Sequence, residues 1–291
     1  MKLAGLTTDS KGKSKTEIHS LEAFRFSIPN ALAKNDSFKD ILNAIETDVT
    51  SYCKQHKLPH PAQGSFNNCR GRWYEWLFMI YMWNHFVTKG STIRPLPLPN
   101  SNHFQFTKLY NNELYGYLAD LEDKLLLNHQ VRLVTSSPDY VLIDIKDLSL
   151  PDPLLSSTFD PEDFSDDVKS YLDELYKTFI GKCDLNTIRG FISIKTSVRS
   201  DRRFQWLHEG NLAKSLYQHL RTRRWDIDAK GIKFYGFTSE MKDADRNALM
   251  TATTHTIASI GLQPERSVDK PFLILGKSDL EQALHEISQE M

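Results

Sequence analysis

The chain has 291 residues and a formal net charge of −1, and 40% of its residues are hydrophobic and 25% charged. This composition is typical of a water-soluble globular protein with ample core material, and no apolar run approaches the roughly 18–20 residues that a membrane span requires. Three widely spaced cysteines form neither a disulfide framework nor a zinc pattern, so we expect reduced thiols in a cytosol.

The first third of the chain is expected to be helical after a polar start. Residues 1–15 are polar and rich in lysine, serine and threonine, which predicts a flexible lead before a single domain over residues 16–291. Apolar residues at helical spacing predict a helix over 37–57. Residues 64–71 indicate a loop, and the apolar run over 73–83 predicts a buried helix.

Strands and helices alternate in the rest of the chain. Three alternating prolines at 95–99 predict an extended spacer, and an acidic insertion at about 150–175 is expected to be a solvated excursion. The other expected elements are a helix over 107–128, strands over 131–135 and 139–145, a strand over 191–195, a helix over 206–220, a strand over 232–237, a helix over 243–260, a strand over 272–275 and a helix over 280–287. This alternation favours a mixed α/β fold, with a central mixed β-sheet flanked by helices.

Positive charge is concentrated in residues 189–224. This segment holds nine Lys/Arg against two acids, a local charge of +7 in a nearly neutral chain. Proteins that neutralise phosphates release the counterions of a nucleic acid, so such a segment predicts a surface for a polyanion. The alternative is a solvated charged helix.

Arg199, Asp201 and Arg202 lie just after the expected strand that ends at Lys195. Arginine binds the O6 and N7 atoms of guanine together, and aspartate accepts a hydrogen bond from the amino group of cytosine. The cluster is therefore suited to reading adjacent G·C pairs. The alternative is that Asp201 is only a salt-bridge partner of the arginines.

Residues on two expected strands fit metal-dependent hydrolysis of a phosphodiester. This chemistry needs a divalent cation held by carboxylates and a further positive charge near the phosphate. Asp139 opens one expected strand after a proline and Lys195 ends another, which is the PD…(D/E)xK arrangement. Ser193 stands where this pattern requires Asp or Glu, and Glu209, early in the next helix, is the candidate replacement. The alternative for Glu209 is a first-turn glutamate favoured by the helix dipole.

A further candidate acid is Glu75, inside the apolar run over 73–83. A lone carboxylate in such a helix is costly unless it is paired or bound to a metal. The alternative is an ion pair with Arg70 or Arg72.

Three segments resemble the tetrameric (type IIF) restriction endonucleases that recognise a CCGG core, and most closely those that cut purine-CCGG-pyrimidine. They are GSFNNCRGRWYEW, TSSPDYVLIDI and ISIKTSVRSDRRFQWLHEGNLAKSLYQHLRTRRW, and they lie in order within roughly residues 60–260. The group belongs to the PD-(D/E)xK nuclease superfamily. Ser193 with Glu209 resembles a variation of that group in which the second metal carboxylate moves from the strand to the following helix.

The resemblance implies a restriction-endonuclease-like PD-(D/E)xK core with a Mg²⁺ site. Asp139 and Glu209 would hold the ion, and Lys195 would position or activate the water. Glu75 would be an auxiliary acid that binds a further metal or orients the site.

The same resemblance implies roles in DNA recognition and assembly. The expected readers of the inner CCGG are Arg199, Asp201 and Arg202. Readers of the outer base pair are expected near Asn67 and Asn68, and Trp225 matches a region of contact between dimers.

The implied function is that of a bacterial, cytoplasmic type II restriction endonuclease. It would be a homodimer that assembles to a homotetramer, away from membranes, in a host whose cognate methyltransferase protects the same sites. Cleavage would follow R/CCGGY and leave four-base 5′ overhangs with 5′-phosphate ends. Two alternatives stay open: a repair or resolvase-type nuclease that recognises DNA shape, and a non-cleaving CCGG-binding protein.

Overall fold

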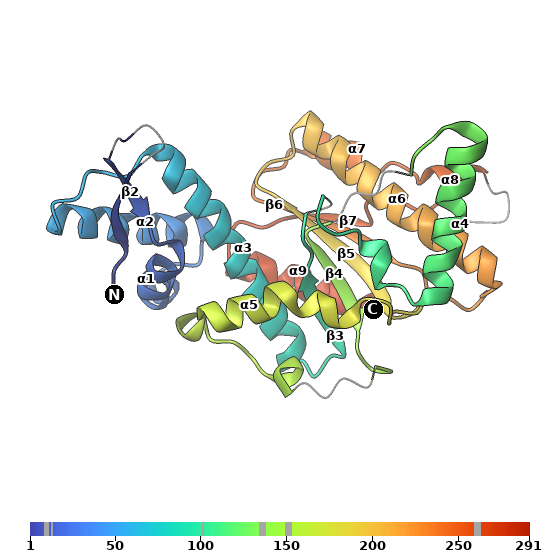
Figure 1. Ribbon diagram of the computed structural model, residues 1–291, viewed down its shortest axis with the longest axis horizontal. Helices are drawn as coiled ribbons and strands as arrows, with labels where there is room; N and C mark the ends of the chain where they lie inside the picture. Colours follow the sequence, from blue (N-terminus) through green and yellow to red (C-terminus); the bar gives the residue numbers. More distant parts are fainter. Residues whose placement is uncertain (9–11, 13, 101, 134–137, 149–152, 259–262) are drawn as a thin grey trace. The chain divides into compact units, whose positions relative to one another are not determined.

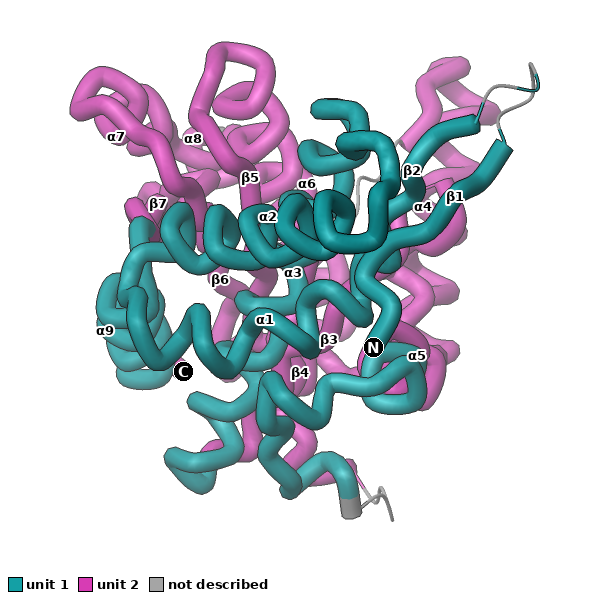
Figure 2. Tube along the Cα trace, turned by 90° about the vertical axis from the view of Figure 1, so that its left-hand side faces the viewer, with its two compact units in different colours: residues 1–90, 153–170, 275–290 teal, residues 91–152, 171–274, 291 magenta. Residues whose placement is uncertain are grey.

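The computed structural model describes residues 1–8, 12, 14–100, 102–133, 138–148, 153–258 and 263–291 (Figure 1). The chain divides into two compact units (Figure 2). Unit 1 comprises Met1–Gly90, Pro153–Ser170 and Leu275–Glu290, and unit 2 comprises Ser91–Asp152, Tyr171–Ile274 and Met291. The expectation of a single domain over residues 16–291 stays a prediction.

Unit 1 is mainly helical. Its helices pack around large aromatic side chains, of which Trp73 and Trp83 are fully buried. Its elements are β1 (Ala4–Thr8), β2 (Ser14–Ile18), α1 (Ser20–Lys34), α2 (Phe38–Gln55), α3 (Gln63–Thr88), η2 (Pro153–Ser156), η3 (Pro161–Asp163) and α9 (Lys277–Gln289), together with the start of α5 (Asp166–Glu174). The helix expected over 37–57 is confirmed as α2.

The described residues near the N-terminus form a hairpin where a flexible lead was expected. Strands β1 and β2 pair antiparallel, with Ala4 opposite Ile18. Leu3 and Ala4 are 2% and 0% exposed. Backbone pairing and burial of these two side chains order this part of the chain, so the expectation of a flexible lead is wrong for it.

The loop expected over 64–71 is instead the start of helix α3. Glycine and asparagine are poor helix formers, and they misled the prediction. Phe66 and Cys69, three residues apart, are 0% and 6% exposed and share one buried face of the helix. Packing of that face outweighs the unfavourable propensity of its neighbours. The buried helix expected over 73–83 is confirmed.

Residues 153–170 of the acidic insertion pack into unit 1 through their apolar side chains. Trp83 donates from Nε1 to the carbonyl of Ser157 at 2.8 Å, and the rings of Phe164 and Phe24 lie 5.9 Å apart, centre to centre. Six of the insertion's described acids are exposed: Asp160, Glu162, Asp163, Asp166, Asp167 and Glu174. Contacts of Ser157 and Phe164 therefore hold the segment against unit 1 while its acids face solvent, so it is not a wholly solvated excursion.

Unit 2 is built on a mixed five-stranded sheet in the order β3-β4-β5-β6-β7. The pairs β3–β4 and β4–β5 are antiparallel, whereas β5–β6 and β6–β7 are parallel. The strands are β3 (Ile93–Pro97), β4 (Tyr140–Asp144), β5 (Ile188–Lys195), β6 (Lys233–Thr238) and β7 (Lys270–Leu273). The mixed α/β class with a central sheet flanked by helices is confirmed.

The helices of unit 2 include α6, which runs beside α4 along the sheet (Figure 1). They are η1 (Phe106–Leu109), α4 (Asn112–His129), η4 (Leu175–Phe179), α6 (Ser200–Arg224), α7 (Asp243–Leu249) and α8 (Thr254–Ala258), together with the end of α5. None of the described helices is long and apolar enough to cross a membrane.

Three expectations for unit 2 differ from the structure. The proline-rich spacer forms β3, an edge strand, where the missing N–H groups of proline are tolerated. The helix expected over 243–260 is broken into α7 and α8, and residues 259–260 lie outside the described residues. The strand expected over 131–135 is absent at 131–133, and the rest of it also lies outside the described residues.

Candidate active site

Asp139 lies directly before β4 and accepts three hydrogen bonds on one oxygen, Oδ2. The donors are the hydroxyl of Ser193 at 3.1 Å, the backbone N–H of Ile194 at 2.5 Å and the ammonium of Lys195 at 3.1 Å. All three come from the end of β5, the neighbouring antiparallel strand. The strand pairing thus fixes the carboxylate beside the lysine, and the donors leave Oδ1 as the oxygen that can bind a further partner.

Ser193 stands two residues before Lys195, so the two side chains point to the same face of β5. Ser193 is fully buried, and the side chain of Lys195 is 11% exposed. The hydroxyl cannot supply the charge of the missing carboxylate. Its donation to Asp139 instead helps to hold that carboxylate in place.

Glu209 supplies a second carboxylate from α6 and is 3% exposed. Its Oε1 accepts a hydrogen bond from Nε2 of Gln205 at 2.8 Å, while Oε2 is buried without a hydrogen-bond partner among the described residues. Burial raises the pKa of Glu209 to about 7. The charge of Lys195, the bond from Gln205 and a weaker interaction with the hydroxyl of Ser193 oppose the rise in pKa, and the charge of Asp139 adds to it. The structure thus brings Asp139, Lys195 and Glu209 together.

Close packing of α6 on the sheet explains how a helix delivers this carboxylate. Trp206 is fully buried against Gly236 of β6, where a Cβ atom would lie 2.6 Å from the indole ring. At Gly210 a Cβ would lie 2.0 Å from the carbonyl oxygen of Ser267. Only glycine permits these approaches, and they flank Glu209 from both sides along the helix.

A divalent ion fits the donors of this cluster. Among the described residues no group of three or more His, Cys, Asp or Glu side chains is placed to hold a metal. Mg²⁺ does not require such a group, because it keeps several waters and binds through one or two carboxylates plus phosphate oxygens. Oε2 of Glu209 is buried without a hydrogen-bond partner among the described residues, and a bound cation would offset the cost of burying it. The two carboxylates are therefore a suitable Mg²⁺ pair.

Most of the basic segment 189–224 is used inside the protein. Lys214 is 3% exposed and pairs with Asp269 at 2.7 Å, and Arg189 donates to the carbonyl of Met291 at 2.8 Å. The other internal partners are Asp245 for Arg203, the carbonyls of Asp226 and Ile227 for Arg221, Asp120 for Arg223, and Asp184 for Arg224. The interpretation of the whole segment as a polyanion surface is therefore too broad.

The arginines of that segment that pair only with a neighbouring residue of their own turn lie at its start. The side chains of Arg199, Asp201 and Arg202 are 71%, 62% and 43% exposed, at the first turn of α6. Asp201 lies 3.8 Å from Arg199 and 3.7 Å from Arg202, distances of loose ion pairs in water. We call these three residues the reader cluster; a partner entering from solvent can displace the loose pairs at little cost.

Three other candidate residues lie in unit 1, on α3. Glu75 is exposed, so the buried carboxylate expected there is wrong, because it lies on the solvent side of a helix whose other sides are buried. Arg70, one expected partner, pairs instead with Glu46 at 2.7 Å. Asn67 and Asn68 are exposed as well, within a helix and not in a loop. The functional roles of Glu75, Asn67 and Asn68 stay predictions.

Trp225 ends α6 in a left-handed backbone conformation, with φ of 56°. Its side chain is 80% exposed, and that of the nearby Ile227 is 72% exposed. The exposure suits the interface role expected for Trp225, which stays a prediction.

Sequence reasoning missed Gln205, whose amide fixes the carboxylate of Glu209. The signal was present, since residues four apart face each other on a helix. It also missed Asp245, the partner of Arg203. No sequence signal pointed to that pair, because the two residues lie on different helices.

The strand-borne aspartate and lysine, the helix-borne glutamate and the mixed sheet define a nuclease of the PD-(D/E)xK class. The Cfr10I/Bse634I restriction endonuclease family matches residues 5–290 of the chain. The type II restriction enzyme Cfr10I of Citrobacter freundii is 37% identical over 237 residues, which cover 78% of this chain and 79% of that enzyme.

Solved structures agree with this match. The Bse634I restriction endonuclease has a TM-score of 0.88 and 33% identity, and the match covers 98% of this chain and 97% of that one. A crystal structure of the type IIF restriction endonuclease Bse634I with cognate DNA has a TM-score of 0.84, at the same identity and coverage. The chain belongs to the Cfr10I/Bse634I restriction endonuclease family and is a type II restriction endonuclease, an enzyme that cuts DNA.

Proposed function

We propose that this enzyme is a Mg²⁺-dependent homotetramer that cuts both DNA strands at R/CCGGY, leaving four-base 5′ overhangs with 5′-phosphate ends. The observation that carries the proposal is the cluster of Asp139, Lys195 and Glu209 at one end of the sheet. The CCGG core is the site that the sequence resemblance implies, and membership of the Cfr10I/Bse634I family supports that resemblance.

The cluster supports the following division of work. Asp139, through Oδ1, and Glu209, through Oε2, would hold the ion, which would polarise the scissile phosphate and lower the pKa of a water. Lys195 would orient the attacking water and stabilise the charge that develops on the phosphate. The new bond forms between the water oxygen and phosphorus, the bond from phosphorus to the 3′ oxygen breaks, and that oxygen takes up a proton. Glu75 is proposed as an auxiliary acid.

The reader cluster is proposed to recognise the inner CCGG. Arg199 and Arg202 would each bind guanine through O6 and N7, and Asp201 would accept from the amino group of cytosine. Their exposure and their position after the catalytic strand support these roles. Asn67 and Asn68 are proposed to contact the outer base pair.

The partners follow from the symmetry of the site. A palindrome has two equal half-sites, and two copies of the chain related by a two-fold axis would each read one. Two such dimers would form the tetramer through the surface around Trp225. The enzyme is proposed to work in the bacterial cytoplasm, where a cognate methyltransferase protects the host's own sites.

Digestion of a plasmid of known sequence with Mg²⁺, followed by sequencing of the ends, tests this proposal. Discrete fragments that begin at CCGG are expected, and their flanking bases give the outer preference. Cutting of branched or damaged DNA without regard to CCGG would favour a structure-specific nuclease. Binding to CCGG without any cutting would favour a non-cleaving protein.

Substituting Asp201 should change specificity more than overall DNA affinity. We expect Asp201→Ala to lower the affinity for a CCGG duplex by about tenfold or more, because one base-reading contact is worth roughly 1–3 kcal/mol. The affinity for a duplex without CCGG should hold or rise, because a negative charge has been removed. Titration of both duplexes with Ca²⁺ in place of Mg²⁺ measures the two affinities. The matched control is Asp243→Ala, an exposed acid in the first turn of α7; an equal loss on both duplexes would make Asp201 a structural residue.

Substituting Trp225 should separate dimers from tetramers. Trp225→Ala removes an exposed indole but leaves a non-glycine residue at the same positive φ, so little change in folding stability is expected. Sedimentation is expected to give dimers for the variant and tetramers for the unchanged chain. Phe26→Ala in α1, another exposed aromatic, is the control and should leave the tetramer intact. Tetramers of the Trp225 variant would place the interface elsewhere.

A further inference from the structure

The loop that precedes the reader cluster is tied to the next loop of the sheet. This reader loop runs from β5 to α6, and its neighbour runs from β6 to α7. The hydroxyl of Ser239 donates to the carbonyl of Thr196 at 2.8 Å, and the N–H of Val198 donates to the carbonyl of Glu240 at 3.2 Å. Because β5 and β6 are parallel neighbours, both loops leave the same edge of the sheet.

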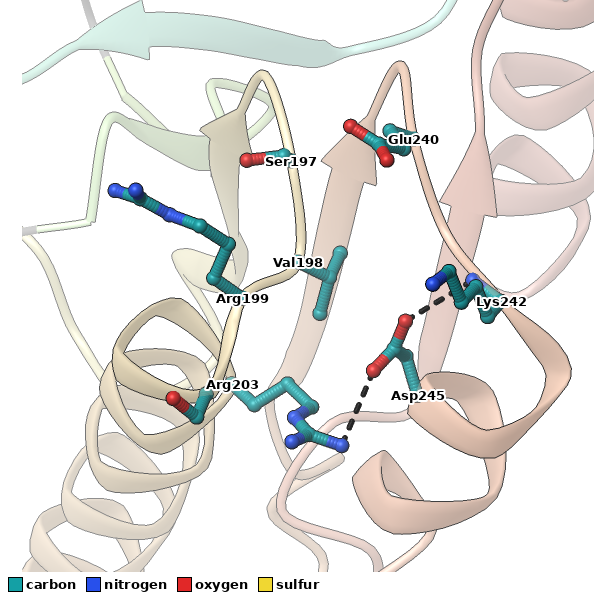
Figure 3. A pocket seen from close by; sticks show the side chains of 8 residues that line it. Ser197, Val198, Arg199, Arg203, Glu240, Lys242 and Asp245 are labelled. Atoms are coloured by element: carbon teal, nitrogen blue, oxygen red, sulfur yellow. Dashed lines mark hydrogen bonds and ion pairs between the residues drawn. The ribbon is translucent and has the colours of Figure 1, made fainter.

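A third link is an ion pair between the helices that follow these loops. Nη1 of Arg203 lies 3.1 Å from Oδ1 of Asp245, and the two side chains are 30% and 17% exposed. Oδ2 of Asp245 accepts from the backbone N–H of Lys242 at 3.0 Å, so the carboxylate caps α7 while it binds the guanidinium (Figure 3). Both oxygens of Asp245 are thus engaged, which holds Arg203 against a fixed partner.

Arg203 follows Arg202 directly but has a different environment. Arg203 bridges from α6 to α7 along the wall of an open pocket of about 410 Å³, which Arg199 and Ser200 also line (Figure 3). Among the described residues, the side-chain ion pairs of Arg199 and Arg202 are the loose ones with Asp201, which do little to fix the turn. The bridge at Arg203 is the nearest firm side-chain anchor to them along α6.

We propose that Arg203 and Asp245 are positioning residues that set the reader cluster for discrimination of the site, a role that rests on the proposed function of that cluster. Base reading by arginine requires both hydrogen bonds to guanine at once, which demands accurate placement of the turn. The ion pair supplies that placement by fixing the first turns of α6 to α7, without itself reaching a base.

Two conservative variants and their combination test this role. Arg203→Met keeps much of the side-chain volume but removes the charge, and Asp245→Asn keeps an acceptor for the N–H of Lys242 but removes the ion pair. Affinities are measured with Ca²⁺ for a CCGG duplex, a duplex with one base pair of the core changed, and a duplex without the core. Arg246→Met, an exposed arginine of α7, is the control, and thermal unfolding checks that each variant is folded.

Each single variant is expected to lose about tenfold in affinity for the CCGG duplex. The double variant should lose no more than either single one, because both remove the same link. Affinity for the duplex without the core, and its dependence on salt, should be unchanged. Arg203→Lys, which can still reach Asp245, should recover most of the loss.

Two outcomes would overturn this role alone. Arg203→Met could weaken binding to all duplexes and reduce the salt slope by about one, with Asp245→Asn unchanged; Arg203 would then be a phosphate contact. Alternatively, both variants could keep the discrimination of the unchanged chain. An unchanged chain that shows no preference for CCGG would overturn the proposed function itself, and this role with it.

Discussion

Lys195→Ala is expected to reduce DNA cleavage by at least about a thousandfold, because the variant loses the charge that faces the reacting phosphate and the group that orients the water. Lys195 is nearly buried and pairs with Asp139, and it is also the cation whose charge acts on Glu209. The same variant should still bind a CCGG duplex with Ca²⁺, because the substitution leaves the three residues of the reader cluster unchanged. Single-turnover cleavage and Ca²⁺ titration of the same duplex measure the two effects.

A second lysine of the same sheet provides the control. Lys233 lies at the start of β6, is 42% exposed and faces Asp269 at 3.5 Å. Lys233→Ala is expected to cut DNA at the unchanged rate. Asp139→Asn should behave as Lys195→Ala does, because the amide keeps the shape but not the charge. Unchanged cleavage by either active-site variant would place the reaction elsewhere in the chain.

The sheet and the two strands that bring Asp139 and Lys195 together could be predicted from the sequence. Strand β5 is buried over its first six residues and ends in Ile194 and Lys195, which are slightly exposed. A short apolar run that ends in a polar residue at the sheet edge is a local pattern, and so is the Pro-Asp pair before β4. Such local patterns can be recognised in a single sequence, and they predicted that Asp139 and Lys195 lie close together.

The errors have a shared cause, which is that the deciding contacts are distant along the chain. A charge count over 189–224 cannot show that Arg224 pairs with Asp184, forty residues earlier, or that Lys214 is buried against Asp269. The same holds for the start of α3, where burial of Phe66 decides between loop and helix. The sequence alone did not decide whether Glu209 is a metal ligand or a first-turn glutamate. Its position beside Asp139 depends on the close approach of Trp206 to Gly236, which joins residues distant in sequence.

The buried carboxylate that makes the site suitable for a metal should also destabilise the metal-free protein. Glu209 has a folded-state pKa of about 7, above its usual value of 4.5, so the folded protein holds this proton more tightly than the unfolded chain. The stability that Glu209 contributes is therefore fully present below pH 4.5 and is lost as the pH rises to about 7. Above that, the charged form costs roughly 3 kcal/mol relative to the neutral one.

Glu209→Gln should consequently be more stable than the unchanged chain at pH 8 in EDTA, by up to roughly 3 kcal/mol, and nearly equal to it at pH 4.5. Its neutral amide resembles the protonated acid and has no charge to desolvate. Mg²⁺ should stabilise the unchanged chain at pH 8 and leave the variant unaffected, and the variant should not cleave DNA. Urea unfolding at both pH values, with and without Mg²⁺, measures these differences.

The control is Glu122→Gln, an exposed glutamate of α4, which should leave the pH dependence of unfolding as it is. A Glu209→Gln variant less stable than the unchanged chain at pH 8 would mean that the contacts of the charged carboxylate with Lys195, Gln205 and Ser193 outweigh the cost of its burial. Glu209 would then be a structural residue. A gain in stability together with a loss of the Mg²⁺ response would instead mean that the fold gives up stability to keep a carboxylate ready for a metal, as functional sites commonly do.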